Sequence, residues 1–128
     1  MVAMSRHLNA LVVDDDQGIR LTVGEALQTV GHRAFAAANR AEALEVVRFQ
    51  PVHFSIVDVH VQADDGIRII RCLRKQTGAL PVIFMSGAFT PEIVARAEAL
   101  GARHCLEKPL DVHRLLDAVQ ELISLEDL

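Results

Sequence analysis

The sequence predicts an α/β protein with a doubly wound parallel sheet, and two patterns carry this prediction. Short continuous apolar runs alternate five times with segments whose apolar residues recur at helical spacing. The runs are apolar at nearly every position, which is typical of strands covered by helices on both faces. Right-handed crossovers then connect the strands, and the functional site of such a sheet lies at the carboxyl ends of its strands.

Each of the five units reads as a strand followed by a helix. The predicted strands cover residues 8–13, 33–37, 53–57, 81–85 and 103–106. Polar residues suited to helix capping or turns precede the helical patterns: Asp16, Asn39 with Glu42 three residues later, the Asp64-Asp65-Gly66 loop, Thr90 before Pro91, and Asp111. The polar stretch from residue 59 to residue 66 is predicted as a loop.

Size and charge limit the possible functions. The chain has 128 residues, 51% of them apolar, which suffices for one core and is too few for two ordinary domains. The formal charge of −4 and thirteen scattered Lys and Arg residues give no basic field for nucleic acid. No apolar run reaches the roughly 18 to 20 residues of a spanning helix. We therefore expect a cytoplasmic protein that binds neither nucleic acid nor membrane, with Cys72 and Cys105 as reduced thiols.

Reactive side chains stand where four of the predicted strands end. Asp14 and Asp15 follow the first strand, Asp58 the third, Ser86 the fourth and Lys108 the fifth. Because the carboxyl ends of parallel strands meet at one edge of a sheet, we expect these side chains to lie together.

This group of residues predicts phosphoryl chemistry. Clustered carboxylates repel one another unless a cation or proton intervenes, and an all-oxygen site open to water suits Mg²⁺ better than zinc. An ionised aspartate can attack phosphorus while a metal and an ammonium group absorb the charge on the phosphoryl oxygens. We predict Asp58 as the nucleophile with Lys108 opposite it.

The same residues resemble a known family. Leu-Val-Val-Asp-Asp-Asp, Asp58 at the end of an apolar strand with Asp65-Gly66 downstream, Met-Ser-Gly and Glu-Lys-Pro look like a CheY-like receiver domain of two-component response regulators. The resemblance covers nearly the whole chain. It implies a flavodoxin-like sheet of order 2-1-3-4-5 in three α/β/α layers, and a single receiver over residues 1–128 with no output domain.

The resemblance also implies a role for each site residue. Asp58 would be both phosphoacceptor and Mg²⁺ ligand, Asp15 a direct ligand, Asp14 a ligand mostly through water, and the His60 backbone carbonyl a further ligand. Ser86 and Lys108 would contact the phosphoryl group and report its presence to the surface. A histidine kinase or a histidine phosphotransfer protein would be the donor. A downstream protein would bind around the fourth helix, fifth strand and fifth helix, and the protein would be a monomer or a phosphorylation-dependent homodimer.

Several positions depart from the family's usual pattern. Cys105 stands where receivers usually carry the aromatic residue whose movement exposes a partner-binding surface, so that form of switch is absent or displaced, with His104 as a neighbouring candidate. Gln62 replaces a common proline and Asp64 a common apolar residue, which predicts a more mobile and more acidic loop. Ala88 offers no acid or amide beside the path of attacking water, so the dephosphorylation rate does not follow from the sequence.

Simpler interpretations exist for single residues. Asp16 can serve only as a helix cap, Asp65 can simply begin a helix, and Ser86 beside Gly87 can be turn chemistry. His7, His32, His53 and His113 are expected at the surface or at an edge, and His104 is expected to pack on the fifth strand.

Two other functions remain open from the sequence. The missing aromatic residue fits a degenerate receiver that only docks a partner, without phosphorylation. An aspartyl nucleophile with a hydroxyl, a lysine and Mg²⁺ also fits a phosphohydrolase of the haloacid-dehalogenase type, although that family carries a second Asp where His60 stands. The leading hypothesis is a signalling receiver that catalyses only its own phosphorylation and dephosphorylation.

Overall fold

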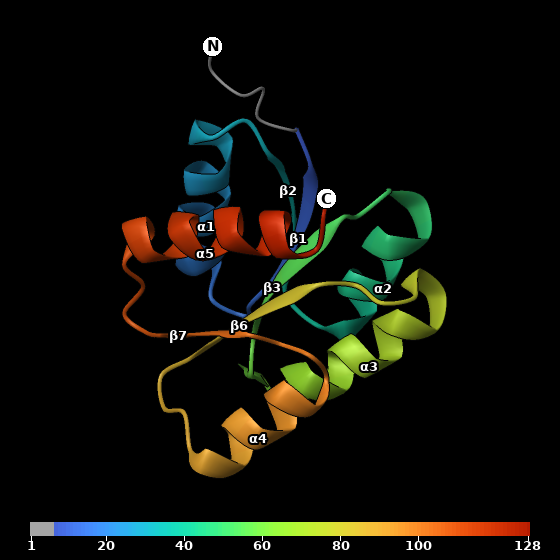
Figure 1. Ribbon diagram of the computed structural model, residues 1–128. Helices are drawn as coiled ribbons and strands as arrows, with labels where there is room; N and C mark the ends of the chain where they lie inside the picture. Colours follow the sequence, from blue (N-terminus) through green and yellow to red (C-terminus); the bar gives the residue numbers. More distant parts are fainter. Residues whose placement is uncertain (1–6) are drawn as a thin grey trace.

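A computed structural model describes residues 7–128 (Figure 1). Its central sheet has five parallel strands in the order β2-β1-β3-β6-β7, which confirms the predicted 2-1-3-4-5 arrangement. The strands of this sheet are β1 (Asn9–Val13), β2 (Arg33–Ala37), β3 (Phe54–Asp58), β6 (Val82–Ser86) and β7 (His104–Glu107). The helices are α1 (Gln17–Thr29), α2 (Arg40–Phe49), α3 (Gly66–Thr77), α4 (Pro91–Ala99) and α5 (Val112–Leu125).

The helices form two layers that enclose the sheet. Helices α1 and α5 cover one face, and α2, α3 and α4 cover the other (Figure 1). Successive residues of β1 therefore enter different cores: Leu11 and Val13 pack toward α2 and α3, while Ala10 and Val12 pack toward α1 and α5. Because both faces are buried, apolar residues are favoured at nearly every position of such a strand, which is why the strands read as nearly continuous apolar runs.

Side-chain caps fix the starts of all five helices. Asp16, Asn39, Asp65, Thr90 and Asp111 each accept a hydrogen bond from a backbone N–H in the first turn of the following helix. These contacts confirm the predicted caps at Asp16, Asn39, Thr90 and Asp111, as well as the view that Asp65 begins a helix. The caps end each loop at a defined residue, and the loops after β1, β3, β6 and β7 carry the candidate site.

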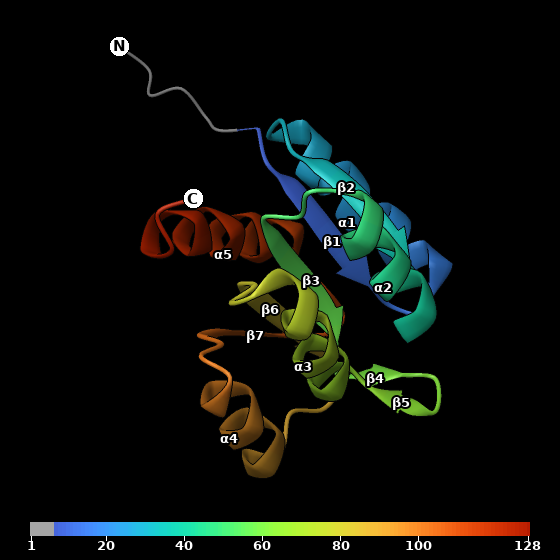
Figure 2. The ribbon, with the colours of Figure 1, turned by 90° about the vertical axis from the view of Figure 1, so that its right-hand side faces the viewer.

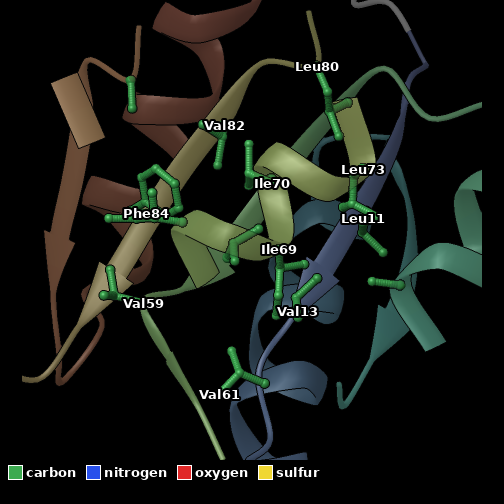
Figure 3. Close-up of a cluster of buried hydrophobic side chains, with 14 of the residues drawn as sticks. Leu11, Val13, Val59, Val61, Ile69, Ile70, Leu73, Leu80, Val82 and Phe84 are labelled. Carbon is green, nitrogen blue, oxygen red and sulfur yellow. The ribbon is translucent and has the colours of Figure 1, made fainter. Parts of the chain in front are cut away.

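The polar stretch after β3 is more ordered than the predicted loop. It forms a two-stranded antiparallel hairpin of β4 (His60–Val61) and β5 (Asp64–Asp65), which lies beside α3 (Figure 2). Val61 is fully buried in the core between the sheet and α3, near Val13 and Ile69 (Figure 3). This hairpin could not be predicted from the sequence, because its two strands have only two residues each and its turn lacks glycine.

Within the described residues, none of the helices is both long and apolar enough to cross a membrane.

Candidate functional site

The candidate site lies at the carboxyl end of the central sheet. Asp14 directly follows β1, Asp58 and Ser86 are the last residues of β3 and β6, and Lys108 directly follows β7. The parallel register aligns these ends, since Asp58 is paired with Met85 and Ser86 with Glu107. The structure thus brings the predicted strand-end residues to one edge, as the doubly wound fold requires.

Lys108 joins two buried carboxylates. Its Nζ donates to Asp14 Oδ2 and to Asp58 Oδ2, each at 2.8 Å. Asp14 has an exposed fraction of 0% and Asp58 of 5%. Burying two like charges without a counterion would be costly, so the lysine is a structural requirement of this arrangement as well as a chemical group.

Burial and pairing change the protonation of this cluster. Burial raises the pKa of Asp14, and the nearby Asp58 charge adds to that rise, although the hydrogen bonds from Lys108 and from the Asp16 N–H oppose it. Burial lowers the pKa of Lys108, but the hydrogen bonds to Asp14 and Asp58 outweigh it and raise the pKa overall. Lys108 is therefore held as an ammonium ion, whereas the ionised form of Asp14 is disfavoured.

The acidic residues fit a divalent cation. Asp14, Asp15 and Asp58 can each offer an oxygen, and these oxygens all lie within 4.8 Å of one another. One ammonium group balances one of the three carboxylates, which leaves two negative charges for a cation to neutralise. Asp15 is exposed, so a cation bound by the three carboxylates would also be open to water. Carboxylate ligands together with several retained water molecules are what Mg²⁺ prefers.

The β4–β5 hairpin touches two of these carboxylates through its backbone. The His60 N–H donates to Asp58 Oδ1 at 3.1 Å, and the Gln62 N–H donates to Asp15 Oδ2 at 3.1 Å. Asp15 itself is exposed. The position of His60 beside Asp58 suits its predicted use of a backbone carbonyl, but ligation by that carbonyl stays a prediction.

Ser86 reaches the site through the backbone, while its hydroxyl faces its own loop. The hydroxyl donates to the Ala88 carbonyl at 3.0 Å and accepts from the Ala88 N–H at 3.1 Å. The Ser86 carbonyl accepts from the Lys108 N–H at 2.9 Å, which ties β6 to the lysine. In this arrangement the hydroxyl stabilises the turn after β6. Contact with a phosphoryl group would require it to turn away from Ala88.

Two contacts that support the site were not predicted from the sequence. Gly66 packs so closely on the Asp58 carbonyl that a Cβ atom at this position would overlap it. Arg20 donates from its guanidinium to the Asp14 carbonyl at 2.8 Å. The Asp65-Gly66 pair was noted as a motif, but a close backbone approach is visible only in three dimensions, and an arginine six residues after an aspartate carries no sequence signal.

Cys105 and His104 point to opposite faces of β7. Cys105 is half-buried against the core on the α2, α3 and α4 side, and burial raises its thiol pKa. His104 Nε2 lies 3.2 Å from Glu121 Oε1 of α5. His104 therefore packs on its strand as predicted, but alternation along β7 places its ring on the face away from Cys105, where it does not replace the absent aromatic residue.

Comparisons with known proteins agree with the fold. The model of the response regulator receiver domain family matches residues 10–120. Sporulation initiation phosphotransferase F of Bacillus subtilis is 29% identical over 91% of this chain and 94% of its own length. A putative NtrX-like response regulator of Rickettsia felis is 33% identical over 86% of this chain, which spans only 24% of that relative.

Solved structures give the same result. The chemotaxis protein CheY4 of Vibrio cholerae superposes with a TM-score of 0.84 at 28% identity, covering 91% of this chain and 99% of that one. NtrX from Brucella abortus gives a TM-score of 0.87 at 27% identity, covering 95% of this chain and 28% of that one.

The matched family and the similar structure of CheY4 are receivers, which are signalling modules rather than classical enzymes. The chain belongs to the response regulator receiver domain family of two-component systems. Receivers of this family take phosphate from histidine kinases and act on downstream partners.

Proposed function

We propose that Asp58 accepts a phosphoryl group from a phosphohistidine donor in a reaction that depends on Mg²⁺. The observation that carries this proposal is the contact of Lys108 Nζ with Asp14 and Asp58 inside a cluster of three carboxylates. The donor would be a histidine kinase or a histidine phosphotransfer protein, and its phosphohistidine P–N bond would break as an Asp58 oxygen bonds to phosphorus.

The residues of this chain have distinct parts in the proposed reaction. Asp58 is fixed by its contacts with the His60 N–H and with Lys108, so its carboxylate needs little reorganisation before attack. Lys108, already cationic, can move from the carboxylates to the oxygens of the transferred group. Asp14, Asp15 and Asp58, with the His60 carbonyl, would hold Mg²⁺, which supplies charge neutralisation at the phosphoryl oxygens.

Phosphorylation would change the local contacts enough to act as a switch. It adds charge and three strong acceptors beside Lys108 and the Ser86 hydroxyl. The hydroxyl now bonds to Ala88, so a phosphoryl group could draw the loop after β6 inward as the hydroxyl changes partner. The proposed readout is a partner protein that binds around α4, β7 and α5.

We propose that the chain acts alone as a receiver, so that its output passes through another protein. The support is that two similar proteins are covered almost completely, at 94% and 99% of their length. The NtrX-like relatives, of which the chain spans 24%, mark the alternative of a receiver within a larger protein.

The test is the intact mass of the protein after incubation with acetyl phosphate and Mg²⁺. We expect a gain of one phosphoryl group that disappears in Asp58→Asn and when the metal is chelated. Asp117→Asn, which changes an exposed carboxylate on α5, is the matched control and should gain the group normally. A folded natural protein that gains nothing would favour the docking module, and sustained release of phosphate from a generic ester would favour the phosphohydrolase.

A further inference from the structure

The exposed carboxylate of Asp15 is held by the hairpin that follows the phosphoacceptor. Within residues 7–128, the Asp15 carboxylate makes one hydrogen bond: its Oδ2 accepts from the Gln62 N–H at 3.1 Å. Asp14 and Asp58, by contrast, are buried and joined through Lys108. The direction of the Asp15 carboxylate therefore depends on residue 62, which lies 47 positions away in the sequence.

The backbone at Gln62 has a special conformation that presents this N–H. Its φ angle is 56°, in the left-handed region that non-glycine residues adopt uncommonly. Proline, which receivers commonly carry at this position, has no N–H and a φ angle fixed near about −65°. A chain with proline here could not make the hydrogen bond that this chain makes.

Two ion pairs and one buried side chain hold the hairpin in place. Arg40 of α2 forms two hydrogen bonds with Asp64, from Nε at 2.9 Å and from Nη2 at 2.7 Å. Arg96 of α4 donates to Asp65 Oδ2 at 2.6 Å. The buried side chain of Val61 anchors the first strand of the hairpin in the core (Figure 3). Ion pairs with this two-point geometry fix orientation as well as distance.

We propose that the hairpin is a positioning element for the metal site. The Gln62 N–H turns the Asp15 carboxylate toward Asp14 and Asp58, and Arg40 and Arg96 are positioning residues that hold the hairpin where it can do so. Outer contacts of this kind orient ligands without touching the metal. The inference rests on the proposed function in one respect only, that Mg²⁺ binds at these three carboxylates.

The first test compares two substitutions at one residue by calorimetric titration of Mg²⁺ into the full chain. Gln62→Pro removes the N–H and should raise the Mg²⁺ dissociation constant about tenfold, the lower end of the effect of outer-shell contacts. Gln62→Gly is the conservative variant: it keeps the N–H and accepts a positive φ, and should restore binding to within about twofold. Equal Mg²⁺ affinity in the proline variant and the natural protein would overturn the proposal.

A second test uses the ion pair with Asp64. Arg40→Gln should raise the Mg²⁺ dissociation constant about threefold or more. This effect should be smaller than that of Gln62→Pro, because the hairpin is loosened while the Gln62 N–H remains. The matched control is Arg71→Gln, which removes an exposed arginine of α3 and should leave Mg²⁺ affinity unchanged. Removal of a positive charge alone would strengthen cation binding. Similar losses in both variants would therefore mean that the contact with Asp64 is not the cause, and would contradict the proposal.

The two proposals can fail separately. Hydrogen exchange of the Gln62 amide, measured by NMR without metal, reports the hydrogen bond to Asp15 directly. We expect this amide to exchange at least several times faster in Asp15→Asn than in the natural protein, because a neutral amide oxygen is a weaker acceptor. Unchanged exchange would refute the positioning contact, whereas absence of Mg²⁺ binding with a protected Gln62 amide would refute only the metal site.

Discussion

The two ends of the central sheet bury polar residues in different ways. Toward the amino ends of the strands, His32 Nδ1 accepts from the Leu8 N–H at 3.2 Å, and the Ser55 hydroxyl donates to the Pro81 carbonyl at 2.9 Å. At the carboxyl ends, Asp14 and Asp58 share a lysine. His32 and Ser55 at the amino end bond to backbone groups, whereas Asp14 and Asp58 at the carboxyl end also depend on a side chain, the Lys108 ammonium group.

This difference separates structural polar residues from functional ones. The backbone partners of His32 and Ser55 lie next to β1 and β6, and both side chains are buried, so these two hydrogen bonds are parts of the fold. A side-chain partner can rotate away, so Lys108 can leave the carboxylates for a ligand. Burial acts alike at both ends: it lowers the pKa of His32, with a further contribution from His7, and it raises the pKa of Asp14. In both cases the uncharged form is favoured.

The largest expected change in stability comes from Gly66, because its backbone packs closely on the Asp58 carbonyl at the carboxyl end of the sheet. Gly66→Ala should lower the free energy of unfolding by about 3 kcal/mol, because its Cβ would overlap the Asp58 carbonyl, which is fixed in the central sheet. Urea unfolding would measure this loss.

Gly24→Ala is the control for the Gly66 variant. Its Cβ would lie 3.8 Å from the Ala34 Cβ, an ordinary contact, and it should stabilise α1 by about 0.5 to 1 kcal/mol. A Gly66 variant as stable as the natural protein would show that the backbone at the carboxyl end can give way, and would weaken the contrast between the two ends.

A smaller effect, of opposite sign, is expected at Asp14. Because burial raises its folded-state pKa above the ordinary value of 3.8, ionisation of Asp14 costs stability as the pH rises through that raised pKa. Without Mg²⁺, Asp14→Asn should therefore be more stable than the natural protein by about 1 kcal/mol at neutral pH, as is common when a functional residue is replaced.

The pH dependence distinguishes this cause from simple repacking. The stability gain of Asp14→Asn should shrink as the pH falls toward 3.8 and vanish below that value, where Asp14 becomes protonated in the folded and unfolded states alike. Thermal unfolding in metal-free buffers between about pH 4 and pH 8 would follow it. A stability gain that is independent of pH would show that the charge of Asp14 does not destabilise the natural protein.

The residues of the site could be predicted from the sequence, whereas the hairpin contacts that hold Asp15 could not. Asp14, Asp58, Ser86 and Lys108 each follow a run of apolar residues, and the end of a buried strand is a place that a sequence shows directly. The parallel sheet followed from the pattern of apolar runs, and its strand order from the resemblance to receivers.

The hairpin that holds Asp15 depends on contacts between distant segments. Arg40 with Asp64, and Arg96 with Asp65, are 24 and 31 residues apart and obey no local periodicity. His32 shows the same limit in the core: it was expected at the surface or at an edge, but it is only 7% exposed because the Leu8 N–H gives its ring a partner inside. A single sequence does not record such pairings.

The last prediction compares two serines, one from each end of the sheet. Ser55→Ala and Ser86→Ala each remove a hydroxyl bonded to a backbone carbonyl and should each cost about 1 kcal/mol in urea unfolding. Only Ser86→Ala should slow phosphorylation by acetyl phosphate, by about tenfold or more, because only its hydroxyl can reach the proposed phosphoryl group. Equal phosphorylation rates in the two variants would mean that the Ser86 hydroxyl only stabilises its turn. Lys108 would then be the group at the carboxyl end of the sheet that moves to the phosphoryl group, without help from a hydroxyl.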